Sequence, residues 1–316
     1  MKTFFKFLQR NKLYTAIEVF GLSVALGFVV LLASYARTEY SVGRTRPAHD
    51  SIDAAGYGER IGMTLGTGEK ILNHLPAFTS WTRISCLLGA HVLVGDEYHQ
   101  VQAVGADADF FQFMQMPLLA GDQARALRDR ESVVLTESCA RRLFGTSDAI
   151  GKSLTWQRGG ERVRLHVTGV MPDLGPSSIF QDIDMVVPML YLQGYVAEMD
   201  NFGSVFTFTR LAAGTSAEKA QKDLLQGYKD YWQDWPDNGD NGSFLWGASL
   251  VPVSGIYFAP IERDNGVLRK GDRSRVLTLV GVALMLLLSA LFNYVNLTVA
   301  QTGRRAREMA TRRLVG

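Results

Sequence analysis

The side chains that most often bind metals or act as nucleophiles are widely spaced in this chain of 316 residues. They are five histidines and two cysteines: His49, His74, His91, His99, His166, Cys86 and Cys139. Zinc sites place their ligands a few residues apart, as in C-x2-C or H-E-x-x-H, and neither spacing occurs. No G-x-S-x-G turn presents a nucleophilic serine. The sequence therefore predicts neither a catalytic nor a metal site, and an enzyme function is not expected.

A glycine-rich stretch, GYGERIGMTLGTGEK at residues 56–70, suggests phosphate binding at first sight. A P-loop requires Ser or Thr after its lysine, but Ile71 follows Lys70. A dinucleotide-binding loop requires a third glycine where Ile61 stands. We therefore predict two turns between short strands, and no cofactor bound by this chain. The acid pairs Asp107/Asp109 and Asp182/Asp184 are typical of loops.

Two long apolar runs bracket the chain, at residues 19–36 and 276–300. A bilayer core requires about 20 apolar residues in a helix, which the second run exceeds and the first reaches with residues 16–18 included. A buried core helix is the alternative for each run, but such helices seldom continue so far without a charge. We predict transmembrane helices at 16–37 and 275–300.

The first run also resembles a secretory signal peptide, with Ser34-Tyr35-Ala36 as a small-x-small cleavage site. However, the apolar stretch is longer than a usual signal core. Two pairs of small residues four apart, Gly21/Ala25 and Ser23/Gly27, suit close helix packing in lipid. These features favour a retained helix over a cleaved leader.

Basic residues concentrate at the two ends of a chain whose net charge is only +2. We predict that seven of them set the topology: Lys2, Lys6, Arg10, Lys12, Arg304, Arg305 and Arg307. The positive-inside rule places both ends in the cytoplasm and residues 38–274 across the membrane. Basic residues at 269–275 oppose this orientation, but long loops translocate largely regardless of charge. Cys86 and Cys139 would then lie in an oxidising compartment, where free thiols are expected and a disulfide stays the alternative.

The segment between the apolar runs has the pattern of a mixed α/β domain. Residues 132–136 predict a strand, and Thr136 caps a helix that Gly145 ends. Residues 152–171 predict a hairpin that turns at Gly159-Gly160. Its second strand alternates apolar and basic side chains, and solvent is the expected environment of the basic face. That face carries Arg162, Arg164 and His166, opposite Val163, Leu165 and Val167.

A second helix is predicted after the strand-like residues 205–213. Thr215 and Glu218 have the spacing of a capping box. Apolar and aromatic side chains then recur at helical spacing, which predicts core packing. They are Ala217, Ala220, Leu224, Tyr228, Tyr231 and Trp235.

Several stretches in this order resemble FtsX/MacB-type ABC transporter permeases, and the chain is similar to the long permeases of Bacteroidetes-type bacteria. They lie at residues 6–26, 103–122, 131–154, 167–188 and 292–316. The resemblance implies an α+β membrane protein in which two transmembrane helices flank a large mixed α/β extracytoplasmic domain, the MacB-like periplasmic core. That domain would have two lobes, one inserted in the other. Family members continue into further helices, so the chain is expected to be the N-terminal part of a longer product.

The implied division of the chain has five segments. A cytoplasmic amphipathic segment, 1–15, precedes the first transmembrane helix, 16–37. The periplasmic domain, 38–274, precedes the second transmembrane helix, 275–300, and a cytoplasmic coupling segment, 301–316.

The resemblance also implies a function in the bacterial inner membrane. A permease of this type transmits ATP-driven motion of a separate ATPase subunit, which binds ATP and Mg²⁺, to its periplasmic domain. It exports or extrudes a peptide, antibiotic or lipoprotein-like substrate. The implied partners are the ABC ATPase, a second permease, membrane lipid, and a periplasmic adaptor or outer-membrane channel, with no nucleic acid. The alternative is a membrane-anchored periplasmic sensor or scaffold without transport activity.

The C-terminal segment predicts an amphipathic helix. On a helical wheel the apolar side chains of Met309 and Leu314 oppose a face rich in arginine. Arg313 falls within the apolar side, where a helix lying on a membrane would disfavour a charge. We therefore predict that Met309, Arg312 and Arg313 contact the ATPase, matching the family's cytoplasmic joint after the second helix.

Overall fold

The computed structural model describes residues 12–58, 60–158, 160–191, 205–232, 247–263 and 266–315. The chain divides into a two-helix unit, Met1–Tyr40 with Asp272–Gly316, and a single domain, Ser41–Gly271. Each is described by itself.

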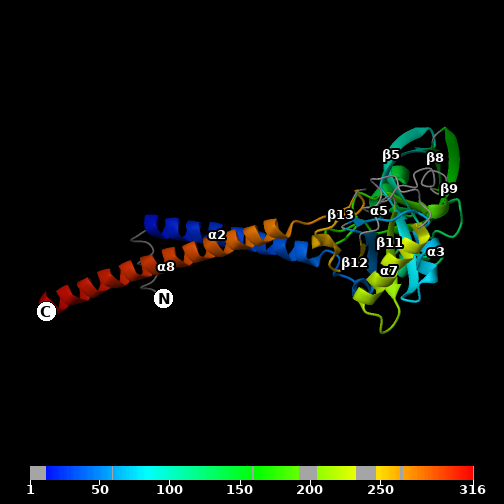
Figure 1. The fold of residues 1–316 in the computed structure, drawn as a ribbon. Helices are drawn as coiled ribbons and strands as arrows, with labels where there is room; N and C mark the ends of the chain where they lie inside the picture. Colours follow the sequence, from blue (N-terminus) through cyan, green and yellow to red (C-terminus); the bar gives the residue numbers. More distant parts are fainter. Residues whose placement is uncertain are drawn as a thin grey trace. The chain divides into compact units, whose positions relative to one another are not determined.

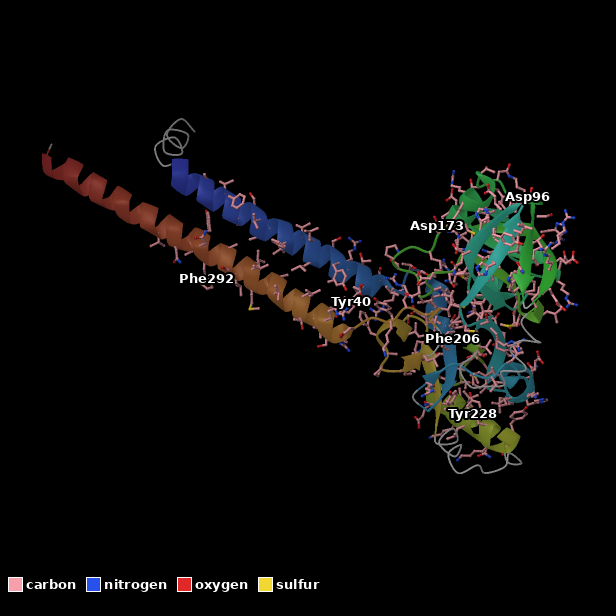
Figure 2. All side chains as sticks on the ribbon, turned by 90° about the horizontal axis from the view of Figure 1, so that it is seen from above. Tyr40, Asp96, Asp173, Phe206, Tyr228 and Phe292 are labelled. Atoms are coloured by element: carbon pink, nitrogen blue, oxygen red, sulfur yellow. The ribbon has the colours of Figure 1, made fainter. Side chains whose placement is uncertain are left out.

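The two-helix unit contains the long helices α2 (Lys12–Ser41) and α8 (Arg273–Val315) (Figure 1). Each includes a stretch long and apolar enough to cross a membrane, Val19–Ser41 and Arg273–Asn296, with mean hydropathies of 2.2 and 2.3. Only 6% and 11% of these stretches is buried within the protein, so neither is a core helix. Figure 2 shows Phe292 projecting from α8, and its side chain is 64% exposed. Helices that are apolar on all sides and unburied are suited to a lipid environment.

The middle of the domain folds into a closed barrel, which we call the barrel lobe. Strand β10 pairs with both β7 and β5, and this joins the ends of the order β10-β7-β9-β8-β4-β5. Closure leaves these strands without a free edge. The six strands are β4 (Leu88–Val94), β5 (Glu97–Ala106), β7 (Ser132–Thr136), β8 (Ser153–Arg158), β9 (Glu161–Met171) and β10 (Met185–Pro188).

Alternate side chains of these strands fill the barrel. Val92, Trp156 and Leu165 belong to one buried apolar cluster inside it. The predicted strand 132–136 is confirmed as β7, and all five of its residues are buried because its outer face is also covered. The hairpin is confirmed as β8 and β9, with Gly160 at φ +94° and Gly159 outside the described residues. The basic face of β9 is solvent-facing as predicted: Arg162 and Arg164 are exposed and His166 is half-buried.

Helix α5 (Glu137–Phe144) packs against the barrel. Its termini confirm the prediction, because Thr136 accepts a hydrogen bond from the Cys139 N–H and Gly145 adopts the left-handed conformation at φ 72°. Cys139 is buried in the cluster, whereas Cys86 is half-buried. Both are free thiols, as expected.

Segments from before and after the barrel form a second sheet, which we call the sheet lobe. It follows the order β3-β11-β1-β2-β13, with β12 paired to β1. Figure 2 shows Asp96, in the β4–β5 turn, and Tyr228, on α7, at opposite ends of the domain, with Phe206 between them. The strands are β1 (Asp53–Tyr57), β2 (Arg60–Ile61), β3 (Phe78–Ser85), β11 (Val205–Leu211), β12 (Ala248–Pro252) and β13 (Glu262–Arg263).

Helix α7 (Ala217–Trp232) covers part of the sheet lobe. The predicted stripe is confirmed in its middle, where Ala220, Leu224 and Tyr228 are buried. It is wrong at Ala217 and Tyr231, which are exposed, and Trp235 lies outside the described residues. The predicted cap is wrong by one residue. The Thr215 N–H closes a turn onto the Ala212 carbonyl, so Ser216 caps the helix by accepting from the Lys219 N–H at 3.2 Å.

The glycine-rich stretch contains one of the two predicted turns. Gly58 turns between β1 and β2. The second prediction is wrong, because a short helix, α3 (Thr67–Lys70), takes that place. A Cβ on Gly68 would lie 2.7 Å from the Trp81 ring, so this glycine permits close packing of α3 instead of a turn.

An ion pair ties β3 to the residue that follows β5. The buried Arg83 guanidinium contacts the Asp107 carboxylate at 2.9 Å and also donates to the Leu65 carbonyl at 2.5 Å. Asp109 accepts a hydrogen bond from the Thr82 hydroxyl at 2.9 Å. This acid pair therefore holds the two lobes together.

Candidate coupling site in the periplasmic domain

The first and last segments of the domain bind the same loop, residues 174–181. The Gly43 N–H donates to the Ser177 carbonyl at 3.1 Å, and the Ser41 and Ser177 hydroxyls lie 2.7 Å apart. From the other end of the domain, the Arg269 N–H donates to the Ile179 carbonyl at 2.8 Å. The Arg269 guanidinium also donates to the Pro176 carbonyl. The loop is thus held by segments more than 200 residues apart in sequence.

The hold from the last segment continues along the loop. The Gln181 N–H donates to the Val267 carbonyl at 3.0 Å, and its side-chain amide donates to the Gly266 carbonyl at 2.9 Å. Phe180 and Leu268 form an isolated antiparallel bridge. The backbone of the loop therefore pairs with residues 266–269 almost as a strand does.

The sequence of the loop explains why its carbonyl groups are available. Ser178 makes a local turn, since its N–H donates to the Gly175 carbonyl at 3.0 Å and its hydroxyl accepts from the Phe180 N–H at 3.1 Å. Pro176 has no N–H and cannot continue a regular ladder. The carbonyls of Pro176, Ser177 and Ile179 are left to accept from other segments.

Two glycines bring a fourth segment, residues 253–258, into close contact. Gly43 has φ +76°, and a Cβ there would lie 2.6 Å from the Val253 carbonyl oxygen. A Cβ on Gly271 would lie 2.2 Å from the Tyr257 ring, and the Gly271 N–H donates to the Tyr257 carbonyl at 2.9 Å. Neither position accommodates a side chain without a shift of its neighbour. We call residues 41–46, 174–181, 253–258 and 266–271 together the junction.

The junction connects both ends of the domain to the barrel. In sequence, Ser41 ends α2, Gly271 precedes α8 by two residues, and residues 174–181 connect β9 to β10. A displacement of either end segment therefore acts on a loop whose two sides continue into barrel strands. This arrangement is suited to transmitting movement, and it contains no group placed for bond chemistry.

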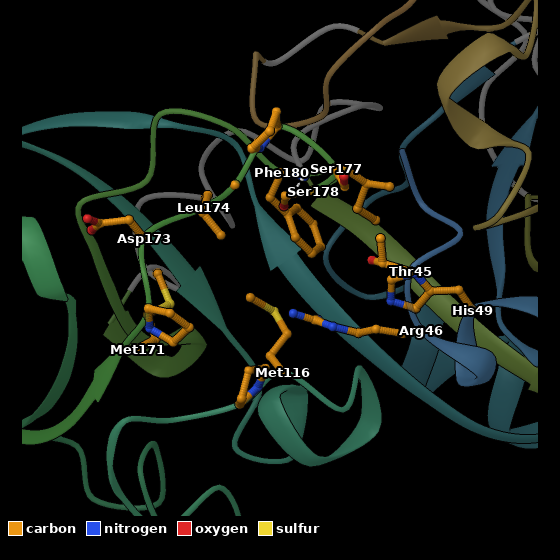
Figure 3. Close-up of a pocket in the computed structure, with 15 residues that line it drawn as sticks. Thr45, Arg46, His49, Met116, Met171, Asp173, Leu174, Ser177, Ser178 and Phe180 are labelled. Atoms are coloured by element: carbon orange, nitrogen blue, oxygen red, sulfur yellow. Dashed lines mark hydrogen bonds between the residues drawn. The ribbon is translucent and has the colours of Figure 1, made fainter. Parts of the chain in front are cut away.

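A cavity of about 190 Å³ lies beside the same loop (Figure 3). Met116, Met171 and Phe180 form a buried apolar wall. Arg46 and His49 line the opposite side. They are three residues apart at the start of the 3-10 turn η1 (Pro47–Ser51), in which side chains at this spacing lie on the same side.

Burial changes the charge properties of this polar side. The pKa of the half-buried Arg46 is lowered by desolvation. His49 is only 4% exposed, and burial is the main cause of its lowered pKa. Asp173 is exposed at the rim, and its carboxylate accepts from the Ser138 N–H at 2.9 Å.

The residues predicted from the sequence to act lie in the two-helix unit, apart from the junction. Met309, Arg312 and Arg313 are within α8, as are Arg304, Arg305 and Arg307, and Lys12 begins α2. Lys2, Lys6 and Arg10 lie outside the described residues. The predicted roles of all these residues stay predictions, as do the predicted domain boundaries.

The sequence reasoning missed the junction and the cavity. Arg269 was considered only for its charge, and His49 only as one of five scattered histidines. The available signal was weak: Gly43 and Gly271 stand just inside the two apolar helices, and a Gly-Pro-Ser-Ser turn stands at 175–178. Pairing between these distant segments required the tertiary structure.

The fold and the junction define the class first: a membrane protein with a large α/β domain between two apolar helices. The family described as "MacB-like periplasmic core domain" matches residues 15–226. The chain therefore belongs to the FtsX/MacB-type ABC transporter permease family. It is an inner-membrane protein with a periplasmic domain, in a family whose permeases normally work with an ABC ATPase and are generally not enzymes themselves.

Solved structures share the fold. A domain of a protein proposed to be a permease, from Porphyromonas gingivalis, has a TM-score of 0.51 at 19% identity and covers 74% of this chain and 98% of its own. The periplasmic region of MacB from Actinobacillus actinomycetemcomitans has a TM-score of 0.47 at 15% identity, covering 65% and 90%. The extracellular domain of the noncanonic ABC-type transporter YknZ from Gram-positive bacteria has a TM-score of 0.43 at 14% identity, covering 58% and 95%. No curated protein matches the sequence.

Proposed function

We propose that this chain is a permease subunit that transmits the ATP-driven motion of a separate ATPase to its periplasmic domain. The movement exports or extrudes a peptide, antibiotic or lipoprotein-like substrate. The observation that carries the proposal is the junction, where the first and last segments of the domain are bonded to one loop through Gly43, Ser177 and Arg269. A relative movement of the two helices would reach the barrel through this loop.

The proposal includes an orientation and a set of partners. Both ends of this chain lie in the cytoplasm, where the ATPase binds ATP and Mg²⁺. The permease works as a dimer, and a periplasmic adaptor or outer-membrane channel completes the export path. The basic residues at the two ends of the chain support this orientation through the positive-inside rule.

The ATPase contact is proposed for Met309, Arg312 and Arg313 on the C-terminal part of α8. A continuous helix from the apolar stretch through Val315 would transmit a push at its cytoplasmic end along its length. Arg313 is the most informative of the three, because it lies within the apolar side of the predicted helical wheel.

The test is Arg313→Glu in the full-length protein, assembled with its ATPase. Reversal of the charge is expected to lower transport-coupled ATP hydrolysis at least tenfold while membrane insertion stays normal. Arg304→Glu is the matched control, since Arg304 is proposed only to support topology and should retain coupling. Unchanged ATP hydrolysis in an inserted Arg313→Glu protein would contradict the contact. A full-length protein that inserts but binds no ATPase would instead favour the sensor or scaffold alternative.

A further inference from the structure

The cavity beside the junction has the composition of a binding site for a compact ligand. Its volume of about 190 Å³ is below the roughly 300–1,000 Å³ of pockets for drug-sized ligands. The apolar wall of Met116, Met171 and Phe180 would contact a small hydrocarbon group. The polar side decides what else the ligand carries.

Arg46 calls for an anion. Figure 3 shows its guanidinium reaching across the cavity toward Met116. Among the described residues its guanidinium has no hydrogen-bond or ion-pair partner, although the side chain is half-buried. A cation in this setting is costly unless a counter-charge is supplied. The exposed carboxylate of Asp173 at the rim disfavours a ligand with a second negative charge.

His49 calls for a hydrogen-bond donor. Its Nδ1 lies 2.9 Å from the Gly43 carbonyl oxygen, which can only accept, so Nδ1 carries the proton. In the neutral ring Nε2 is then an acceptor. This atom is buried and has no partner within the described structure. An N–H or O–H group on the ligand would satisfy it.

We propose that this cavity binds an N-acylated apolar amino acid. Its carboxylate pairs with Arg46, its amide N–H donates to His49 Nε2, and its side chain packs against the wall of Met116, Met171 and Phe180. The carboxyl-terminal residue of a peptide carries the same three groups, so free acyl amino acids and peptide ends share this chemistry. The inference does not rest on the proposed mechanical role.

The first test measures binding of soluble probes to the full chain in lipid nanodiscs by titration calorimetry, with empty nanodiscs as background. N-acetyl-L-leucine carries all three groups. Three relatives each lack one: N-acetyl-L-leucinamide lacks the charge, 4-methylpentanoate lacks the amide, and N-acetylglycine lacks the side chain. Saturable binding of N-acetyl-L-leucine, with each relative at least tenfold weaker, is expected. Absence of saturable binding, or equal binding of the amide, would overturn the site.

The second test changes the protein. Arg46→Met keeps most of the side-chain volume and removes the charge, so the tenfold preference for the acid over the amide should disappear. Arg125→Met is the matched control, because Arg125 is exposed and outside the cavity lining. A preference that persists in Arg46→Met would refute the role of Arg46. If that variant does not fold, the probe series on the unchanged protein still decides the question.

The third test distinguishes the two sources of the ligand. An acetylated tetrapeptide ending in leucine is compared with N-acetyl-L-leucine. Binding of the tetrapeptide as tight or tighter supports a peptide end as the ligand, and weaker binding supports a free acyl amino acid. Failure of both to bind overturns the proposal.

Discussion

The barrel lobe and the junction belong to the same domain but are held together differently. In the barrel lobe a closed ladder of backbone hydrogen bonds surrounds a filled apolar interior. In the junction four irregular segments meet through individual hydrogen bonds, such as those of Ser177 and Arg269, and through glycine contacts. The junction also borders a cavity with an unpartnered buried nitrogen on His49.

This difference teaches where stability and function separate. Regular elements with dense apolar packing open only at a high free-energy cost, whereas irregular segments with few bonds rearrange more easily. The barrel lobe is therefore suited to act as a rigid body, and the junction to be the part that moves. Substitutions in the barrel should lower stability without altering coupling, and substitutions in the junction should do the reverse.

The largest expected effect is on stability, for Leu165→Ala in the barrel interior. Leu165 is fully buried, and such truncations cost about 2–5 kcal/mol in the free energy of unfolding. Chemical denaturation of the full chain followed by tryptophan fluorescence measures the loss. Arg164→Ala, next to it on the exposed face of β9, should stay within about 0.5 kcal/mol. Similar losses for the two variants would show that the barrel interior is not the stabilising core.

The next effect is for Gly43→Ala in the junction. A non-glycine residue at φ +76° with a Cβ 2.6 Å from the Val253 oxygen should cost about 1–3 kcal/mol and reduce substrate-stimulated ATP hydrolysis severalfold. Gly95→Ala is the matched control, since Gly95 has φ +60° but no atom within 4 Å of the added Cβ. If both variants retain full ATPase coupling, the junction does not transmit movement.

A smaller effect is expected for Ser177→Ala, which removes the hydrogen bond with the Ser41 hydroxyl at 2.7 Å. The loss should be about 0.5–1.5 kcal/mol in stability, with a measurable drop in coupled ATP hydrolysis. Ser153→Ala removes a comparable bond to His166 at 2.9 Å on the barrel and should leave coupling intact. Equal ATPase rates for the two variants would argue against a special role for the junction.

The smallest effect is on thiol reactivity. Burial raises the pKa of Cys139 to about 12, so this thiol stays protonated at pH 8 and should react with iodoacetamide far more slowly than an exposed cysteine. Leu165→Ala should accelerate the labelling by increasing opening of the barrel, whereas Gly43→Ala should not. Mass spectrometry of the Cys139 peptide measures the rate. Acceleration by Gly43→Ala alone would reverse the comparison between the two regions.

Local patterns predicted much of the barrel lobe. Strand 132–136, the Thr136 cap and the Gly145 end of α5 depend on neighbouring residues, so they could be predicted without knowledge of the rest of the fold. The errors also have local causes. Thr215 was chosen over Ser216 because both can cap a helix, and only the turn onto Ala212 separates them.

Other features depended on contacts that local patterns do not contain. Gly68 was assigned to a turn because its role is to accept the Trp81 ring, which lies on another strand. Closure of the barrel depends on β10 pairing with two strands at once. Alternation shows that a strand has a buried face, but it does not show which strand lies beside it.

The sequence by itself determined the two apolar helices, the α/β composition between them and the family. These features depend on hydrophobicity and on local residue patterns, which are present in any stretch of about twenty residues. Only the tertiary structure decided that Gly43 and Arg269 bind one loop, and that Arg46 and His49 face one cavity. These arrangements arise from packing between segments far apart in the chain, and packing is a property of the whole fold.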